Sequence, residues 1–262
     1  MCFSILMRVA AAATPPPPPL VYVFVEGNIG AGKSTLLALL EEPLRRALRE
    51  RAGDGALLAV VPEPVHAWQR VPDGDGGGHL NLLDAFYADP PRHAFAFQAH
   101  ALVTRVDAVH AAAAAALAAA GASPSLLVLL CERSVYTDRG VFVRALAQRG
   151  ALTPLERAVY AAWHASWCTR LLPARHAVVA YLDVPPDECA RRVRERARGE
   201  ERALPLEYLE LLHRLHGEAL AQHDTLWPGA ARFTVPSYAL HDAAAPARLA
   251  HDMCSAILAP PS

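Results

Sequence analysis

Five short apolar runs recur along the chain, and longer segments with a helical pattern separate them. The runs cover residues 20–25, 57–61, 126–131, 177–182 and 232–235. Short continuous apolar runs are typical of strands buried on both faces, and their alternation with helices is typical of a parallel sheet. The pattern therefore predicts an α/β fold with a five-stranded parallel sheet flanked by helices.

Four of the intervening segments are predicted to be helices, at residues 36–48, 81–87, 94–120 and 154–171. The last of these has Thr153 as a suitable N-cap, and Glu156 in its first turn, where the helix dipole favours a carboxylate. Residues 73–78 read DGDGGG and are predicted to form a flexible surface loop. We find no internal repeat and no domain boundary after residue 20, so residues 20–262 are predicted to form one domain.

Polar residues follow four of the five apolar runs. They are Glu26-Gly27, Glu63, Glu132-Arg133 and Asp183. Ligands of doubly wound sheets bind at the carboxyl ends of the strands, so we expect the chemistry of this protein to lie at that edge.

The segment after the first run has the full G-x-x-x-x-G-K-[ST] spacing of a phosphate-binding P-loop. Its glycines let successive backbone N–H groups face one centre at the positive end of a helix dipole. The lysine adds a charge for the outer phosphates, and the hydroxyl that follows it can bind Mg²⁺. The alternative is a Gly-rich turn that binds nothing, but a strand before the motif and a helix after it favour nucleotide binding. The predicted phosphate-binding residues are Gly27, Asn28, Ile29, Gly30, Ala31, Gly32, Lys33, Ser34 and Thr35.

Composition narrows the classes of protein to consider. The 262 residues carry a formal net charge of −1 and five scattered cysteines without metal-ligand spacing, which favours a reduced compartment over a disulfide framework. Only one arginine-rich stretch is basic, which argues against a nucleic-acid partner. No apolar run reaches the roughly 18 residues of a membrane span, so we expect no membrane partner.

The first 19 residues differ in character from the rest. They contain one arginine, no acid, an alanine run and five consecutive prolines. We predict a disordered Ala/Pro-rich tail at residues 1–19 and a cytoplasmic protein; the alternative is a mitochondrial transit peptide, since such peptides are poor in acids.

Three further groups carry candidate chemistry. Glu63 lies between two prolines that fix the direction of its side chain. Without further context, a solvent-facing carboxylate in a loop is slightly favoured over a functional role. Glu132-Arg133 can bind Mg²⁺ and stabilise phosphate charge, or form a local ion pair. Five arginines lie within eight positions, at 191, 192, 194, 196 and 198. On a helix they would point in all directions around its axis, which does not suit one fixed binding face. They suit a mobile lid over phosphates, with a solvated charge run as the alternative.

Taken together, these residues resemble the deoxyribonucleoside kinase family, in the branch of deoxycytidine, deoxyguanosine and mitochondrial thymidine kinases. The matching segments are GNIGAGKST (27–35), EPVHAW (63–68), NLLDAFY (81–87), FAFQ (95–98), ERSVYTDR (132–139), RVRERARGEE (192–201) and PLEYLELLH (205–213). They occur in family order and cover most of residues 20–223. The resemblance implies a P-loop kinase fold with an arginine-rich lid, and ATP-dependent 5′-phosphorylation of deoxyribonucleosides in nucleotide salvage.

The resemblance also implies residue roles. Glu63 is the general base for the nucleoside 5′-hydroxyl, and Arg133 steadies it and the reacting phosphate. Ser34 and Glu132 hold Mg²⁺. The lid residues over the phosphates of ATP are Arg192, Arg196 and Arg198. The nucleoside-binding residues are Glu63, Tyr87, Phe97, Gln98, Ala101, Arg105, Asp138, Phe142, Glu201 and Tyr208.

Base preference follows from three pocket positions. Members that accept deoxycytidine and purines tend to carry a small residue, an arginine and an aspartate there, as Ala101, Arg105 and Asp138 do here. Thymidine-preferring members carry bulkier apolar residues and an alanine. We therefore expect deoxycytidine and purine deoxynucleosides to be favoured over thymidine. Residues 239–245 lack an obvious adenine clamp, so the identity of the donor triphosphate stays open.

Other readings remain. One is a thymidine kinase of the same family, or a thymidylate or herpesvirus-type thymidine kinase. Another is a non-catalytic relative with a structural role, like the accessory subunit of respiratory complex I, and a third is an ATP-dependent regulatory or nucleic-acid-binding module. The resemblance further implies a homodimer formed through two long helices, at residues 94–120 and 154–171.

Overall fold

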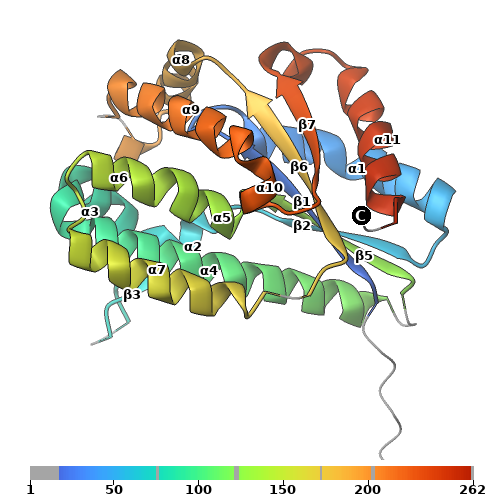
Figure 1. Ribbon diagram of the computed structural model, residues 1–262, viewed down its shortest axis with the longest axis horizontal. Helices are drawn as coiled ribbons and strands as arrows, with labels where there is room; N and C mark the ends of the chain where they lie inside the picture. The colour runs from blue at the N-terminus through green and yellow to red at the C-terminus, as the bar shows by residue number, and fades with distance from the viewer. Residues whose placement is uncertain (1–17, 75–76, 121–123, 172, 202–203, 261–262) are drawn as a thin grey trace, which may run out of the picture.

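The central sheet has five parallel strands in the order β2-β5-β1-β6-β7. The computed structural model describes residues 18–74, 77–120, 124–171, 173–201 and 204–260 (Figure 1). The strands are β1 (Leu20–Gly27), β2 (Ala56–Val61), β5 (Leu126–Glu132), β6 (His176–Asp183) and β7 (Ala231–Pro236). The predicted five-stranded parallel sheet is confirmed, and each strand begins and ends within two residues of its apolar run.

Helices cover both faces of this sheet (Figure 1). Helices α1 and α11 pack together on one face, and α4 packs on β2 and β5 on the other, with α7 beside it. The helices are α1 (Lys33–Ala52), α2 (Val65–Gln69), α3 (Leu82–Ala88), α4 (Pro90–Ala119), α5 (Val135–Thr137), α6 (Arg144–Gln148), α7 (Pro154–Cys168), α8 (Pro186–Arg196), α9 (Leu206–Ala221), α10 (His223–Leu226) and α11 (Ala245–Leu258). Three short helical segments of other types are also present. They are the π-helix η1 (Asp138–Val143) and the 3₁₀-helices η2 (Gly199–Glu201) and η3 (Ser237–Leu240).

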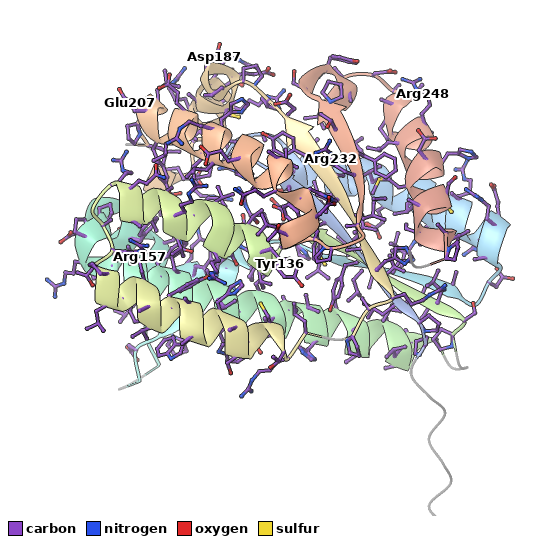
Figure 2. All side chains as sticks on the ribbon, in the orientation of Figure 1. Tyr136, Arg157, Asp187, Glu207, Arg232 and Arg248 are labelled. Atoms are coloured by element: carbon purple, nitrogen blue, oxygen red, sulfur yellow. The ribbon has the colours of Figure 1, made fainter. Side chains whose placement is uncertain are left out.

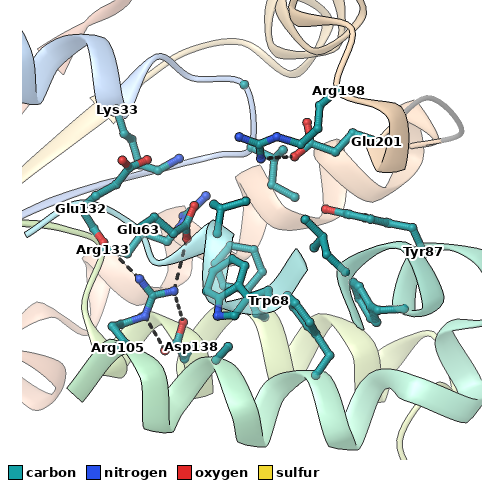
Figure 3. A pocket seen from close by; sticks show the side chains of 18 of the residues that line it. Lys33, Glu63, Trp68, Tyr87, Arg105, Glu132, Arg133, Asp138, Arg198 and Glu201 are labelled. Atoms are coloured by element: carbon teal, nitrogen blue, oxygen red, sulfur yellow. Dashed lines mark hydrogen bonds and ion pairs between the residues drawn. The ribbon is translucent and has the colours of Figure 1, made fainter. Parts of the chain in front are cut away.

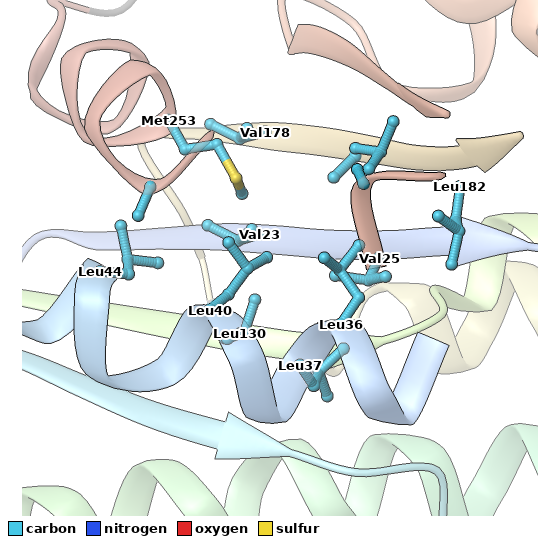
Figure 4. Packing of buried hydrophobic residues seen from close by; sticks show 14 of the residues in the cluster. Val23, Val25, Leu36, Leu37, Leu40, Leu44, Leu130, Val178, Leu182 and Met253 are labelled. Carbon is cyan, nitrogen blue, oxygen red and sulfur yellow. The ribbon is translucent and has the colours of Figure 1, made fainter. Parts of the chain in front are cut away.

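The core beneath α1 explains why the central strands are apolar throughout. Val23 and Val25 of β1 are fully buried against Leu36 and Leu40 of α1 (Figure 4). Burial of a leucine side chain contributes about 1.5–3 kcal/mol. Because α1 begins directly after the loop that follows β1, this packing also fixes the position of the loop at the carboxyl edge of the sheet.

Four predicted helices are present with shifted ends, and the capping of α7 is confirmed. The Thr153 hydroxyl accepts from the backbone N–H of Glu156, and the Glu156 carboxylate accepts from the backbone N–H of Thr153. Helix α1 begins three residues earlier than predicted and ends four later, while α7 ends three residues earlier. Helix α1 is longer than predicted because apolar periodicity ends before polar terminal turns that still form helical hydrogen bonds.

The arginine-rich stretch lies mostly on a helix, and the lid over the phosphates stays a prediction. Residues 186–196 form helix α8, which carries four of the five arginines. Its surface is stabilised by pairs four residues apart, Glu188 with Arg192 and Arg191 with Glu195. A ring of arginines makes physical sense there because acids on the same helix neutralise part of it.

Two other predicted segments lie partly outside the described residues. The DGDGGG stretch falls in the connection between β3 (Val71–Pro72) and β4 (His79–Leu80), a small antiparallel pair, and residues 75–76 are outside the description. The tail predicted at residues 1–19 lies outside it up to residue 17.

Helix α4 is, within the described part of the chain, the one helix long and apolar enough to cross a membrane by length and composition. Its buried side chains include Phe97, Gln98, Ala101 and Arg105, which line a pocket described below. Its place against the sheet is that of a core helix.

Candidate active site

A cavity of about 280 Å³ lies at the carboxyl edge of the sheet and brings together most of the predicted site residues (Figure 3). The predicted residues that line it are Ile29, Gly30, Lys33, Ser34, Glu63, Tyr87, Phe97, Gln98, Ala101, Arg105, Glu132, Arg133, Asp138, Phe142, Arg196, Arg198, Glu201 and Tyr208. The predicted residues that do not line it are Gly27, Asn28, Ala31, Gly32, Thr35 and Arg192.

The loop between β1 and α1 has a backbone that only glycine tolerates at two positions. Gly30 and Gly32 have φ angles of 78° and 98°. A Cβ on Gly30 would lie 2.5 Å from the carbonyl oxygen of Cys189. Glycine is therefore required both for the left-handed turn and for the close approach of α8.

Lys33 is buried at the start of α1, and its Nζ donates to the carbonyl oxygen of Asn28 at 2.8 Å. Burial, and then the nearby charge of Arg133, lower the pKa of Lys33 to about 8. Anionic phosphates in the loop would favour the protonated form and raise this pKa. Without bound phosphate, Lys33 is therefore expected to lose its proton at mildly alkaline pH.

Glu63 is held by two arginines. Its Oε1 accepts from Arg133 Nε at 3.1 Å and from Arg105 Nη2 at 3.2 Å. Burial alone would raise the pKa of Glu63, but the charges of Arg133, Arg105 and Lys33 outweigh it and lower the pKa to about 2. Glu63 is therefore ionised throughout the neutral pH range and fixed in direction.

Arg133 has an unusual backbone for a bulky residue, with φ at 67°. Three contacts hold it there: its backbone N–H donates to Val25 O at 3.0 Å, and Nη1 donates to Gly27 O at 2.6 Å. The guanidinium also lies 4.6 Å from the centroid of the Phe142 ring. Such strain costs about 1–3 kcal/mol and tends to occur at functional sites. It aims the side chain at Glu63 from the end of β5.

Ser34 and Glu132 meet as predicted. The Ser34 hydroxyl lies 2.9 and 3.1 Å from the two carboxylate oxygens of Glu132. The described residues hold no cluster of three or more His, Cys, Asp or Glu side chains suited to a metal. One hydroxyl and one carboxylate match the sparse protein ligation of Mg²⁺, which keeps waters and takes phosphate oxygens.

The wall formed by α4 and η1 is apolar with a charged pair at its base. Phe97 stacks on Phe86 with centroids 4.5 Å apart, and the neighbouring Gln98 is buried. Arg105 donates to Asp138 through Nε at 2.9 Å and Nη2 at 3.2 Å. Burial opposes the charge of Arg105, but the carboxylates of Asp138 and Glu63 raise its pKa above the ordinary value. The side of the pocket next to Ala101 is thus closed by a fixed ion pair.

The opposite wall comes from the segment after α8. Arg196 and Arg198 both pair with the buried carboxylate of Glu201, the latter at 2.9 Å. Burial, and then the charge of Glu201, raise the pKa of Tyr87. Arg192 instead donates to the carbonyl oxygen of Ala31 at 2.7 Å, behind the loop rather than in the cavity.

Several residues of the site were missed by the sequence reasoning. The apolar lining also includes Pro62, Val65, Trp68, Leu83 and Phe86. Most belong to segments 63–68 and 81–87, whose motif membership was the available signal. Glu26 was noted only as a strand end; it is fully buried, accepts from Thr137 Oγ1 at 2.9 Å, and has its pKa raised by burial.

Comparison with known proteins gives consistent matches. The family model described as deoxynucleoside kinase matches residues 23–239. A probable deoxycytidine kinase of fowlpox virus is 33% identical over 206 residues, which is 77% of this chain and 72% of the relative. Bovine deoxycytidine kinase is 34% identical over 216 residues, covering 78% and 76%. Human mitochondrial thymidine kinase 2 is 31% identical over 210 residues, covering 80% and 67%.

Proposed function

Because this chain belongs to the deoxynucleoside kinase family and is a kinase, we propose that it transfers the γ-phosphate of ATP to the 5′-hydroxyl of deoxycytidine and purine deoxynucleosides. The observation that carries the proposal is the position of Glu63. Its ionised carboxylate lies in one cavity with Lys33 of the phosphate loop and Gln98 of the apolar wall. A donor triphosphate can therefore bind on one side of Glu63, and a small nucleoside on the other.

Glu63 is the group that binds the acceptor hydroxyl. In a loose phosphoryl-transfer transition state the main tasks of the protein are positioning and charge neutralisation. A carboxylate with a pKa of about 2 is a weak base but is always ready to accept a hydrogen bond. We infer that Glu63 orients the 5′-hydroxyl first and takes its proton late, while Arg133 keeps the carboxylate in place and faces the transferred phosphate.

The donor side is formed by the loop. Backbone N–H groups of residues 27–35 cradle the β- and γ-phosphates, with Lys33 as a point charge. Ser34 and Glu132 would hold Mg²⁺, whose charge offsets that of the phosphate oxygens. ATP is the proposed donor.

The acceptor side selects the base. Gln98 can pair with a base edge through both ends of its amide. The Arg105–Asp138 pair occupies the side where the methyl group of thymine would have to fit, which favours deoxycytidine and purines over thymidine. Tyr87 and Glu201 would bind the sugar 3′-hydroxyl, and Tyr208 would close the pocket beside them.

The lid arginines must change partners during the reaction. Arg196 and Arg198 are neutralised by Glu201 in the structure. A donor phosphate offers them a doubly charged acceptor, and the nucleoside hydroxyl offers Glu201 a new donor. Binding of both substrates would therefore replace the pairs of Arg196 and Arg198 with Glu201 by contacts of the arginines with phosphate and of Glu201 with the nucleoside hydroxyl.

Three statements about the whole protein belong to the same proposal. Residues 20–262 form the kinase domain, the active form is a homodimer through α4 and α7, and the protein acts in the cytoplasm. No nucleic acid or membrane is proposed as a partner.

The decisive experiment compares nucleoside-dependent ATP consumption by the wild type and by Glu63→Gln. The variant is expected to lose about 10²–10⁴-fold in kcat, because an amide cannot accept the hydroxyl proton. Glu42→Gln, an exposed change of the same kind on α1, is the control and should keep full activity. Wild-type activity in Glu63→Gln would contradict the assigned role.

Substrate choice is tested by measuring kcat/KM for all four deoxynucleosides. Thymidine is the specific competitor, because one relative of this chain is named a thymidine kinase. Thymidine as the best substrate would overturn the proposed preference but not the proposed chemistry.

A further inference from the structure

The carboxylate of Glu200 joins three segments of the wall around the cavity. Its Oε1 accepts from Gln69 Nε2 and from Asn81 Nδ2, each at 2.9 Å. Gln69 is the last residue of α2, Asn81 is the N-cap of α3, and Glu200 lies in η2. These three residues do not line the cavity themselves, and the proposed reaction gives them no role.

Each of the three joined segments carries residues that do line the cavity. Trp68 directly precedes Gln69, Glu201 directly follows Glu200, and α3 contributes Tyr87. Figure 3 shows Glu201 and Tyr87 on the same side of the cavity. Helix α3 also packs against η2. Because neighbouring residues move together, the hydrogen bonds of Glu200 at the outside of the wall determine where these side chains stand inside it.

Asn81 uses both ends of its amide. The Oδ1 atom accepts from the backbone N–H of Asp84 at 2.9 Å and caps α3, while Nδ2 donates to Glu200. A serine or an aspartate would cap a helix as well as an asparagine does. Only the amide also supplies a donor, so the choice of asparagine at this position is explained by the hydrogen bond to Glu200.

Glu200 and the adjacent Glu201 have different partners. Glu201 pairs with the lid arginines Arg196 and Arg198. The hydrogen bond from Asn81, followed by one from a backbone N–H, lowers the pKa of Glu200. Glu200 is therefore ionised at neutral pH, and hydrogen bonds to an ionised carboxylate are about twice as strong as those between neutral groups.

We propose that Glu200 is a positioning residue, which holds Glu201 and Tyr87 at the sugar end of the cavity through its hydrogen bonds to Gln69 and Asn81. The inference rests on the proposed function, in which Glu201 and Tyr87 bind the nucleoside 3′-hydroxyl. Side chains that are in place before a ligand arrives lower the ordering cost of binding. Loss of these hydrogen bonds therefore weakens nucleoside binding.

The test begins with the variant Asn81→Asp. The new carboxylate still caps α3, but it replaces the donor by a second negative charge beside Glu200. KM for deoxycytidine is expected to rise about three- to tenfold, the effect of one lost hydrogen bond. Since Glu63 and Lys33 are positioned by other contacts, kcat should change by less than about twofold.

A second change restores the pair and separates this role from a merely structural one. In Asn81→Asp/Glu200→Gln the amide introduced at position 200 donates to the carboxylate introduced at position 81, so KM should return to within about twofold of the wild-type value. Glu207→Gln is the matched control and should keep the wild-type KM. Glu207 is an exposed carboxylate in the first turn of α9, and Figure 2 shows it at the outer edge of the molecule.

Amide hydrogen exchange of residues 82–88 in the full chain, measured without substrate, tests the same hydrogen bonds independently of kinase activity. We expect faster exchange in Asn81→Asp and wild-type exchange in the double variant. An unchanged KM in Asn81→Asp, or a double variant no better than the single one, would overturn the role of Glu200. Failure of the proposed function would look different: the wild type would phosphorylate no deoxynucleoside, while exchange would still respond to Asn81→Asp.

Discussion

The side chain of Lys33 illustrates how burial sets a functional property of a single residue. Lysine in water has a pKa above 10, whereas burial and Arg133 bring that of Lys33 to about 8. In the free enzyme the charge of Lys33, on which the proposed phosphate binding depends, is therefore sensitive to pH, and this consequence can be measured.

We expect kcat/KM for ATP to fall above pH 8, approaching tenfold per pH unit, because the free enzyme loses the Lys33 proton there. The limb for kcat should lie at higher pH, since bound phosphates keep the lysine charged. Steady-state kinetics between pH 6 and 10 measure both. Lys33→Arg is the control: its guanidinium stays protonated, so the limb near pH 8 should vanish. A limb that persists in this variant would assign the titration to another group.

The buried Arg105–Asp138 pair is the proposed determinant of base preference at the residue scale. Removing one partner alone would leave a buried charge and cost about 3–5 kcal/mol. Arg105→Met/Asp138→Ala removes both charges and makes room for a methyl group. We expect the ratio of kcat/KM for thymidine over deoxycytidine to rise about 10–200-fold, the range for one methyl-sized contact. A ratio that stays constant would place the selectivity elsewhere in the pocket.

At the scale of elements, the ends of β2 and β5 determine where the reactive groups meet. Glu132 is the last residue of β5, Glu63 follows the end of β2 by two residues, and β1 continues into the predicted phosphate loop. Because the strands are parallel and adjacent, their carboxyl ends share one edge. This convergence follows from the apolar pattern and was predictable.

Helix α7 begins with a capping box and carries part of the proposed dimer surface. Thr153→Ala removes the hydroxyl that accepts from Glu156 N–H and should cost about 1 kcal/mol. In a chain of this size that corresponds to a drop of about 2–4 °C in Tm, measured by calorimetry. Ser166→Ala, an exposed change in the same helix, should leave Tm within about 1 °C. Equal shifts in the two variants would show that the box contributes nothing.

Several elements could not be predicted from the sequence, and each has a physical reason. The π-turn η1 places Asp138 against Arg105, but i→i+5 turns have no local signature and depend on packing. Helix α8 was not predicted as a helix, because its charges obscure the periodicity of its buried residues, Cys189, Ala190 and Val193. The apolar wall of Trp68 and Phe86 was likewise identified only by the tertiary fold.

At the scale of the whole molecule, two aromatic residues lie on the surface that we propose as the dimer interface. Trp163 of α7 is 46% exposed and packs against Phe95 of α4, with ring centroids 5.5 Å apart. These are the two helices proposed for the dimer. Analytical ultracentrifugation should give the mass of two chains for the wild type and of one chain for Trp163→Arg.

The control for this prediction is Leu206→Arg, since Leu206 is 41% exposed on α9 and lies outside the proposed interface. That variant should remain dimeric. A monomeric wild type, or a dimeric Trp163→Arg variant, would contradict the assignment of the interface.

What the sequence determined by itself was the sheet, the glycine-rich loop after β1 and most of the candidate residues that line the cavity. Apolar periodicity and glycine spacing are local, and they act through neighbouring residues in the chain. What only the tertiary structure decided was how distant groups control one another: Arg105 and Arg133 lower the pKa of Glu63, and Glu201 neutralises the lid arginines. Charge interactions and burial depend on distance in space, and the sequence does not state that distance.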